Sequence, residues 1–280
     1  MPTTSDTVPV DGLRFDVRVG GPQGGRSVIL LHGFPQTARS WRRVEPLLHT
    51  AGLRTFAPDQ RGYSAGARPR AVGDYTVDRL ARDVVGIADA LGLDRFDLVG
   101  HDWGGFVGWQ VAAQTPHRLR SLTVLSTPHP AAFAAAYDSD ADQRRRSRYI
   151  HLFRWRALPK WFLLRRDAAA LRSAFGDEVP PDVADAYVAA LSQPGALRAA
   201  LNWYRANAIR ALRGTPAVSV PTTYLWGSSD MALRRTAAEA TRNHVDGDYR
   251  FIEIDGGHWI PEARPDQAAA AITQRVTETA

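Results

Sequence analysis

The sequence predicts an α/β fold in which a mostly parallel sheet carries helices on both faces. Short apolar runs alternate with amphipathic helical patterns along most of the 280 residues, which is typical of strand–helix–strand units. Some runs, such as residues 28–31 of the strand predicted at 27–31, are wholly apolar, as expected for strands that are buried on both faces. Residues 131–213 contain helical patterns without a convincing strand, and we expect them to form an insertion.

The predicted elements follow one another along the chain, and turn residues separate them. The strands are expected at residues 13–19, 27–31, 53–57, 96–99, 119–126, 222–226 and 249–254. The clearest helix is predicted over residues 76–91, because apolar residues recur there at positions 77, 80, 81, 84, 88 and 91 and therefore share one face. Helices are also expected over 103–114 and 261–279.

The domain organisation follows from this pattern. We expect an α/β core formed by residues 1–130 and 214–280, with an all-helical cap domain of residues 131–213 inserted into it. Pro159, Pro180 and Pro194 divide the inserted block into short helices. A chain of this length is sufficient for one large α/β domain with such an insertion.

Composition excludes several classes of protein. The hydrophobic fraction is 44% and the charged fraction 23%, which is ordinary for a globular enzyme. The absence of cysteine excludes a disulfide framework, a thiolate metal site and a cysteine nucleophile. Residues 1–10 lack the pattern of a signal peptide, and no stretch approaches the roughly 18 apolar residues of a membrane span. We therefore expect a cytoplasmic protein without a membrane partner.

The net charge is +6. Much of the positive charge lies in one segment, because arginines cluster between residues 144 and 166. A patch that binds nucleic acid or another anionic surface is one interpretation. No nucleic-acid motif accompanies the cluster, so we interpret it as a solvated helix face and expect no nucleic-acid partner.

The most informative motif is Gly-His-Asp-Trp-Gly-Gly at residues 100–105, which places Asp102 between a predicted strand and a predicted helix. This is the context of a nucleophile elbow, in which the central residue is often serine. A carboxylate at the centre can displace a leaving group from saturated carbon and form an alkyl ester on the enzyme. Asp102 therefore predicts a hydrolase that opens a strained ring or expels a halide.

Two further candidates follow the last two predicted strands. Asp230 comes after the strand at 222–226, and His258 comes after the strand at 249–254. Because the carboxyl ends of parallel strands meet at one edge of a sheet, we expect both side chains to lie near Asp102. Histidine is suited to removing a proton from water near neutral pH, and a neighbouring carboxylate can fix its tautomer.

The His-Gly-Phe-Pro motif at residues 32–35 follows another predicted strand. A turn at this position can direct the Phe34 N–H toward Asp102, and the Trp103 N–H is the second expected donor. Together the two amides would form an oxyanion hole for a tetrahedral intermediate.

Each candidate also has a structural interpretation. Asp102 could be a helix cap, Asp230 a turn residue and His258 a buried histidine without a catalytic role. The order nucleophile, acid, histidine along the chain is that of the α/β-hydrolase triad, and the joint occurrence favours catalysis.

With these motifs, the chain resembles the epoxide hydrolases of the α/β-hydrolase superfamily, which are related to the haloalkane and haloacetate dehalogenases. The resemblance extends from about Val10 to the last helix and rests on residues 32–35, 59–64, 100–105 and 257–258. It implies the α/β-hydrolase fold, with a mostly parallel eight-stranded sheet and an inserted helical cap. These motifs are shared by the whole aspartate-nucleophile group.

The resemblance also implies two cap tyrosines that hold the epoxide oxygen and donate a proton as the ring opens. Residues 202–205 are similar to the family motif around the second tyrosine, which assigns this role to Tyr204. Residues 147–149 are similar to the region of the first, which assigns it to Tyr149. A phenol stays neutral at pH 7 and is acidic enough to protonate an alkoxide. Either tyrosine could instead be a packed aromatic of the core.

A dehalogenase with the same triad is the nearest alternative. Halide expulsion requires N–H donors around an anion and no acid, and haloalkane dehalogenases usually have asparagine where this chain has Phe34. An alternative of another class is a non-catalytic hydrolase-fold protein that binds a ligand. Such a protein would have no need of His258 as a base.

The epoxide interpretation predicts a complete reaction. We expect a small hydrophobic epoxide to alkylate Asp102, and a water molecule activated by His258 and Asp230 to release a vicinal diol. The chemistry requires neither a metal nor an organic cofactor, and a homodimer remains open. The aromatic content predicts an apolar substrate site lined by Phe34, Trp103, Phe133, Trp155, Phe162, Trp203 and Trp259.

Overall fold

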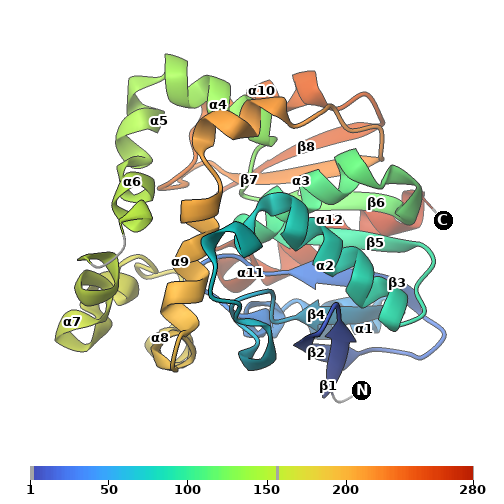
Figure 1. Cartoon of the computed structure of the whole chain (residues 1–280). Coiled ribbons are helices and arrows are strands. Elements are labelled where there is room, and N and C mark those ends of the chain that lie inside the picture. The colour runs from blue at the N-terminus through green and yellow to red at the C-terminus, as the bar shows by residue number, and fades with distance from the viewer. Residues whose placement is uncertain (1–2, 156–157, 280) are drawn as a thin grey trace.

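An eight-stranded sheet forms the centre of the molecule (Figure 1) in the computed structural model, which describes residues 3–155 and 158–279. The strand order is β1-β2-β4-β3-β5-β6-β7-β8. The pairs β1–β2 and β2–β4 are antiparallel and all other pairs are parallel, which confirms the predicted α/β fold. The strands are β1 (Thr4–Val10), β2 (Leu13–Gly20), β3 (Arg26–Leu31), β4 (Leu53–Pro58), β5 (Phe96–His101), β6 (Leu119–Leu125), β7 (Thr222–Gly227) and β8 (Tyr249–Ile254).

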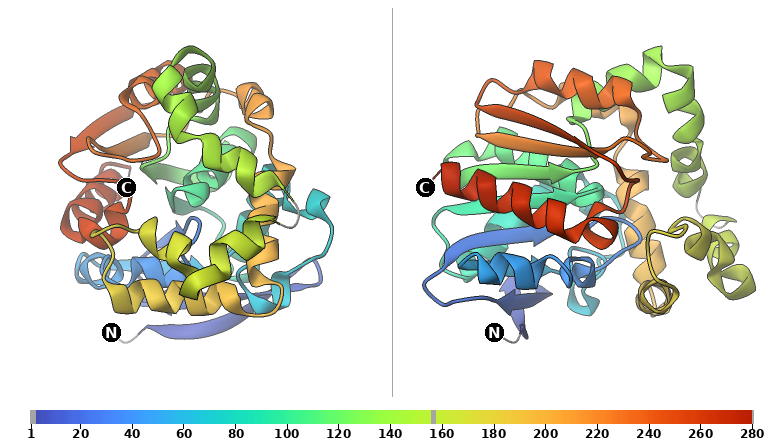
Figure 2. Two further views of the ribbon diagram at one scale, coloured as in Figure 1. Left: turned by 90° about the vertical axis from the view of Figure 1, so that its left-hand side faces the viewer. Right: turned by 180° about the vertical axis from the view of Figure 1, so that it is seen from behind.

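Helices cover both faces of this sheet. Figures 1 and 2 show α2 and α3 on one face and α1 and α12 on the other. The core helices are α1 (Glu45–Thr50), α2 (Val77–Ala90), α3 (Trp103–Gln114), α10 (Arg235–Ala240), α11 (Ile260–Ala263) and α12 (Pro265–Glu278).

Six helices lie between β6 and β7 and are stacked beyond one end of the sheet (Figures 1 and 2). They are α4 (Pro130–Ser139), α5 (Ala141–Arg146), α6 (Arg148–Arg154), α7 (Leu158–Ser173), α8 (Pro181–Ser192) and α9 (Ala196–Ala206). Helix α7 is interrupted, because residues 165–168 depart from helical backbone angles. Within the part of the chain that the structure describes, no helix combines the length and apolarity needed to cross a membrane.

Strand β3 illustrates why the sheet needs helices on both sides. Its consecutive residues point to opposite faces, so Ile29 joins the hydrophobic cluster under α2 and α3, whereas Val28 and Leu30 join the cluster under α1 and α12. All three side chains are fully buried. A strand that is apolar at every position can be stable only when both faces are covered.

Two elements differ from the sequence-based expectation. Strand β1 was not predicted, because only Val8 and Val10 of its seven residues are buried; it is an edge strand paired with β2, and its apolar signal is correspondingly weak. The single helix expected over residues 261–279 is two helices, α11 and α12. Arg264 between them has non-helical backbone angles, φ −134° and ψ +51°, because the following Pro265 disfavours the helical conformation at this position.

The arginine-rich start of the inserted block is largely paired within the chain. Arg145 and Arg146 form ion pairs with Asp142 one helical turn earlier. Arg144 donates to the backbone carbonyls of Tyr137 and Asp138. These contacts fit a solvated helix face in which arginines are neutralised locally.

The loop after β4 links the core to the region of the predicted oxyanion hole. Gln60 donates its backbone N–H to His32 Nε2 at 3.1 Å and its side-chain amide to the His32 carbonyl at 2.6 Å. The next residue, Arg61, forms a bidentate ion pair with Asp83 of α2, with both N–O distances at 2.6 Å. Both partners are buried, so the pair anchors this loop to α2.

Removing Asp83 would leave the buried Arg61 charge without a counterion. We expect Asp83→Ala to lower the free energy of unfolding by about 3–5 kcal/mol, as measured by urea denaturation. Asp89→Ala on the same helix is the matched control, because Asp89 is 59% exposed in its pair with Arg118, and should cost less than about 1 kcal/mol. Equal losses in the two variants would contradict the anchoring role of the buried pair.

Candidate active site

Asp102 occupies a sharp turn between β5 and α3. Its backbone has φ +52° and ψ −121°, a region that costs a non-glycine residue about 1–3 kcal/mol. The turn closes because glycines lie beside it: a Cβ at Gly100 would overlap the Gly104 carbonyl, and a Cβ at Gly104 would overlap the Leu31 carbonyl. The structure therefore places Asp102 in a strained elbow at the carboxyl end of a central strand, as the motif predicts.

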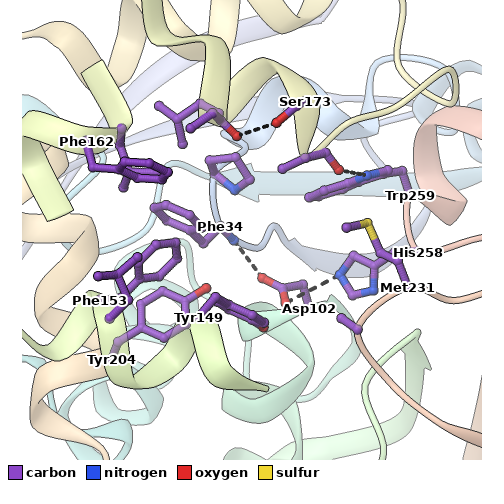
Figure 3. A pocket seen from close by; sticks show the side chains of 17 residues that line it. Phe34, Asp102, Tyr149, Phe153, Phe162, Ser173, Tyr204, Met231, His258 and Trp259 are labelled. Atoms are coloured by element: carbon purple, nitrogen blue, oxygen red, sulfur yellow. Dashed lines mark hydrogen bonds and ion pairs between the residues drawn. The ribbon is translucent and has the colours of Figure 1, made fainter. Parts of the chain in front are cut away.

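The two oxygens of the Asp102 carboxylate have different partners (Figure 3). Oδ1 accepts a hydrogen bond of 2.7 Å from the Phe34 N–H, and Oδ2 lies 3.5 Å from Nε2 of His258. Burial alone would raise the pKa of Asp102, but His258 and the Trp103 amide hold it below its ordinary value. The carboxylate is therefore ionised, with one oxygen fixed and the other facing the imidazole.

The Phe34 amide reaches Asp102 because the chain before it passes very close to the carboxylate. A Cβ at Gly33 would overlap the Asp102 side chain, so only glycine fits there. The preceding His32 is fully buried and held by Gln60, and burial lowers its pKa to about 4. His32 is therefore a neutral structural residue that supports the turn.

His258 lies between two carboxylates. Its Nδ1 donates to Oδ2 of Asp230 at 2.8 Å, while the Nε2 side faces Asp102. Oδ1 of Asp230 accepts from the N–H groups of Ala232 and Leu233, which fixes this carboxylate. Burial alone would lower the pKa of His258, but Asp230 and Asp102 together raise it to about 10. The resting site is thus an imidazolium flanked by two carboxylates.

The backbone of His258 is also fixed, through residues to which the sequence analysis assigned no role. Its carbonyl accepts hydrogen bonds from His101 Nε2 at 2.8 Å and from Ser126 Oγ at 2.7 Å. Burial lowers the pKa of His101 to about 4, so this histidine is a neutral donor. His101 is part of the elbow motif and Ser126 ends the predicted strand at 119–126, but neither position carries a signal of contact with a loop that is more than 130 residues away in sequence.

The structure brings both predicted tyrosines to the same cavity. Tyr149 comes from α6 and Tyr204 from α9, and their rings are 6.1 Å apart. Tyr204 also packs edge-on against Trp103 at 5.0 Å. Burial, together with the nearby charge of Asp102, raises the pKa of both phenols far above the ordinary value. They are consequently neutral hydrogen-bond donors at any working pH.

A cavity of about 320 Å³ lies in front of Asp102, within the size range of small-molecule sites. Asp102 and His258 supply charge at its inner end, and the two tyrosines supply hydroxyl groups (Figure 3). Most of the remaining wall is apolar. The residues that line the whole cavity are Phe34, Pro35, Asp102, Tyr149, Leu152, Phe153, Phe162, Leu163, Ala170, Leu171, Ser173, Ala174, Tyr204, Met231, Ala232, His258 and Trp259.

Phe34, Phe162 and Trp259 therefore line the cavity as expected. The aromatic Phe153, to which the sequence analysis assigned no role, also lines it and packs against Phe34 and Tyr204. Its position on α6, one turn after Tyr149, is the signal that could have identified it, because residues four apart share a helix face.

Four predicted substrate contacts need correction, because their side chains lie outside the cavity lining. Phe133 packs against Phe106 in the core. Trp203 donates to the Arg61 carbonyl and packs against Tyr63. Trp155 is 61% exposed at the end of α6. The Trp103 ring packs edge-on against Tyr204, and the Trp103 backbone amide lowers the pKa of Asp102.

Comparison with known proteins identifies the family. Residues 26–265 match the family model described as alpha/beta hydrolase fold. The chain is 32% identical to the AB hydrolase superfamily protein YfhM of Bacillus subtilis, over 97% of this chain and 96% of that protein. It is also 32% identical to epoxide hydrolase A of Mycobacterium tuberculosis, over 98% and 97% of the two chains.

A solved structure agrees with these relatives. The crystal structure of epoxide hydrolase A from Mycobacterium thermoresistibile superposes with a TM-score of 0.86 at 27% identity, and the match covers 99% of this chain and 98% of that chain. The chain therefore belongs to the alpha/beta hydrolase fold family, in the branch that contains the epoxide hydrolases.

Proposed function

We propose that this protein is an epoxide hydrolase that converts a small hydrophobic epoxide and water into a vicinal diol through an ester on Asp102. The observation that carries the proposal is the position of the Asp102 carboxylate, with Oδ1 bound to the Phe34 amide and Oδ2 beside His258 at the end of an apolar cavity. The names of the relatives at 32% identity support the substrate class.

In the first step, Oδ2 of Asp102 attacks an epoxide carbon and the carbon–oxygen bond of the ring breaks. The electron pair of this bond goes to the former ring oxygen, which takes a proton from Tyr149 or Tyr204. The phenolate that remains recovers its proton from the His258 imidazolium. The products of the step are a neutral alkyl ester, two neutral phenols and a neutral imidazole.

In the second step, His258 removes a proton from water, and the resulting hydroxide attacks the ester carbonyl carbon. Negative charge develops on Oδ1, which already accepts a hydrogen bond from Phe34, and the Trp103 amide favours negative charge on the same side chain. Collapse of the tetrahedral intermediate expels the diol oxygen, which takes the proton of the His258 imidazolium. The Asp102 carboxyl group, whose remaining proton came from the water molecule, then gives that proton to His258. The oxygen of the water molecule stays on Asp102 as one of its two carboxylate oxygens.

The charge on Asp102 sets the order of these steps. While Asp102 is ionised, two carboxylates raise the pKa of His258 to about 10, and an imidazolium cannot remove a proton from water. Esterification removes one of the two negative charges, so the pKa of His258 falls and the ring becomes a base. The base is thus available only when there is an ester to hydrolyse.

We further propose that residues 131–213 act as a cap domain on the core of residues 1–130 and 214–280. Helices α6 and α9 of this block supply Tyr149 and Tyr204, so proton donation depends on the cap, whereas the nucleophile, the base and the oxyanion hole come from the core. Residues 156–157 of the block lie outside the described residues. The cytoplasmic location and a homodimer remain predictions.

The covalent step can be tested by trapping the ester. We expect His258→Gln to accumulate an adduct of one epoxide per protein, located by mass spectrometry on the peptide that contains Asp102, because alkylation needs no base and hydrolysis does. Asp102→Ala is the control and should form no adduct. In wild type, single turnover in ¹⁸O-water should give a first diol without the label. A labelled first diol, or no adduct on His258→Gln, would falsify the ester mechanism.

The acid role can be tested at Tyr204. We expect Tyr204→Phe to lower the rate of ester formation by about 10²-fold, within the usual range for loss of general-acid catalysis, as measured by rapid quench on an epoxide. Tyr137→Phe is the control, because this hydroxyl forms an exposed hydrogen bond with His151 and Tyr137 is not among the residues that line the cavity. Halide release from a matched haloalkane that exceeds diol formation in wild type would instead identify a dehalogenase.

The charge coupling can be tested by titration. We expect the imidazole of His258 to titrate at lower pH in Asp102→Asn than in wild type, because the variant removes a negative charge that stabilises the imidazolium. Nuclear magnetic resonance of ¹⁵N-labelled histidine measures the change, and Asp89→Asn on the surface serves as the charge-matched control. A His258 titration that does not move in Asp102→Asn would contradict the proposed switch.

A further inference from the structure

A short segment of the inserted block packs against the loop that carries His258 and forms hydrogen bonds with it. This segment, residues 174–178 between α7 and α8, is called the clasp. The Ala174 carbonyl accepts a hydrogen bond of 3.0 Å from Nε1 of Trp259. The Phe175 ring packs against the Trp259 ring at 4.9 Å, and the Trp259 ring in turn lies 4.9 Å from the His258 ring.

Glu178 makes the central contact of the clasp. Its Oε1 accepts the Gly257 N–H at 2.8 Å, and its Oε2 accepts the Trp259 N–H at 3.5 Å. The Glu178 carboxylate therefore holds the backbone at residues 257 and 259, the neighbours of His258 in sequence. His101 and Ser126 of the core hold the carbonyl of His258 itself.

The Glu178 carboxylate lies in the space that a side chain at position 257 would occupy. A Cβ at Gly257 would overlap the carboxylate oxygens of Glu178, so the absence of a side chain there is what lets Glu178 approach. Gly257 has no positive φ, and alanine is therefore compatible with its backbone. Glycine at 257 is explained by the contact with Glu178.

We propose that Glu178 is a positioning residue that aligns His258 for hydrolysis of the ester, an inference that rests on the proposed function. Glu178 is not among the residues that line the cavity. Its two hydrogen bonds come from backbone N–H groups and not from the side chains of Asp102 or His258. It acts through the backbone of residues 257 and 259. The backbone around His258 is thus held both by the core and by the inserted block.

The clasp acts on one of the two chemical steps. Ester formation uses Asp102 and the two tyrosines, which are positioned by the Phe34 amide, by the Trp103 ring and by each other. Hydrolysis requires Nε2 of His258 to direct a water molecule at the ester carbonyl, and a displacement of about 1 Å in such a base can cost about 10²-fold in rate. Loss of the clasp should therefore slow hydrolysis selectively.

The clasp also connects the base to the wall of the cavity. Ser173 and Ala174 line the cavity, and the clasp begins at Ala174. A substrate that contacts Ser173 or Ala174 can therefore displace the segment that positions His258. Substrates of different bulk should consequently differ more in the hydrolysis step than in ester formation.

The experiment compares both steps in Glu178→Gln and in wild type. The glutamine keeps the size of the side chain but can offer only one acceptor atom in place of two. We expect rapid-quench measurements to give ester formation within about twofold of wild type and ester hydrolysis about 10- to 100-fold slower. The ester on Asp102 should then accumulate at steady state. If wild type itself forms no ester, the proposed function fails; if wild type forms it and Glu178→Gln hydrolyses it at the wild-type rate, the clasp inference fails.

A double-mutant cycle separates positioning from folding. Gly257→Ala should push the Glu178 carboxylate away and slow hydrolysis to a similar extent, whereas adding Gly257→Ala to Glu178→Ala should cause little further loss, because the carboxylate that it displaces is already absent. Independent, multiplicative losses in the two variants would overturn the inference.

Tyr187→Phe is the matched control for the attachment of the inserted block to the core. Tyr187 on α8 donates to Glu262 of α11, a buried contact between the block and the core that does not involve the His258 backbone. We expect this variant to keep the wild-type ratio of the two steps even where its thermal stability falls. A ratio in Tyr187→Phe that changes as much as in Glu178→Gln would mean that general loosening of the block is responsible, and would overturn the specific role of Glu178.

Discussion

The hydrogen bond from the Phe34 amide to Oδ1 of Asp102 sets the geometry on which the rest of the site depends. It holds one carboxylate oxygen where the ester carbonyl oxygen will be and leaves the other free to react. Because the donor is already in place, charge can develop on Oδ1 without reorganisation. The strained backbone of Asp102 places its carboxylate within reach of this amide. Position 33 has to be glycine, since a Cβ there would occupy the space of the carboxylate.

The electrostatics of the site follow from the same arrangement. His258 is buried between Asp102 and Asp230, so its proton affinity depends on whether Asp102 carries charge. In the proposed reaction the nucleophile therefore controls the base, and no separate switch is required. The tyrosines complement this behaviour, because burial near the same negative charge keeps them protonated. Groups of ordinary acidity acquire distinct roles through their surroundings.

In the proposed reaction, the helices between β6 and β7 contribute to the chemistry as well as to the shape of the cavity. They supply Tyr149 and Tyr204 at one wall and the clasp around Glu178 at the other side of His258. Core and inserted block thus meet at the histidine loop. The further contact between Tyr187 and Glu262 fastens the block beside that loop. A site divided in this way can change its substrate preference through the inserted block while the triad stays fixed.

The sequence by itself determined the features whose causes are local. Apolar runs without alternation specify buried strands, and small residues around Asp102 specify the elbow. The positions of Asp102, Asp230 and His258 after three strands predict that these side chains meet, because strand ends converge in a parallel sheet. Only the tertiary structure decided which helix faces turn toward the cavity. Trp203 and Tyr204 are neighbours about 100° apart on one helix, and the packing of α9 buries the first and presents the second. The contacts of Glu178, His101 and Ser126 with the His258 loop likewise join segments far apart in sequence, and no local pattern encodes such contacts.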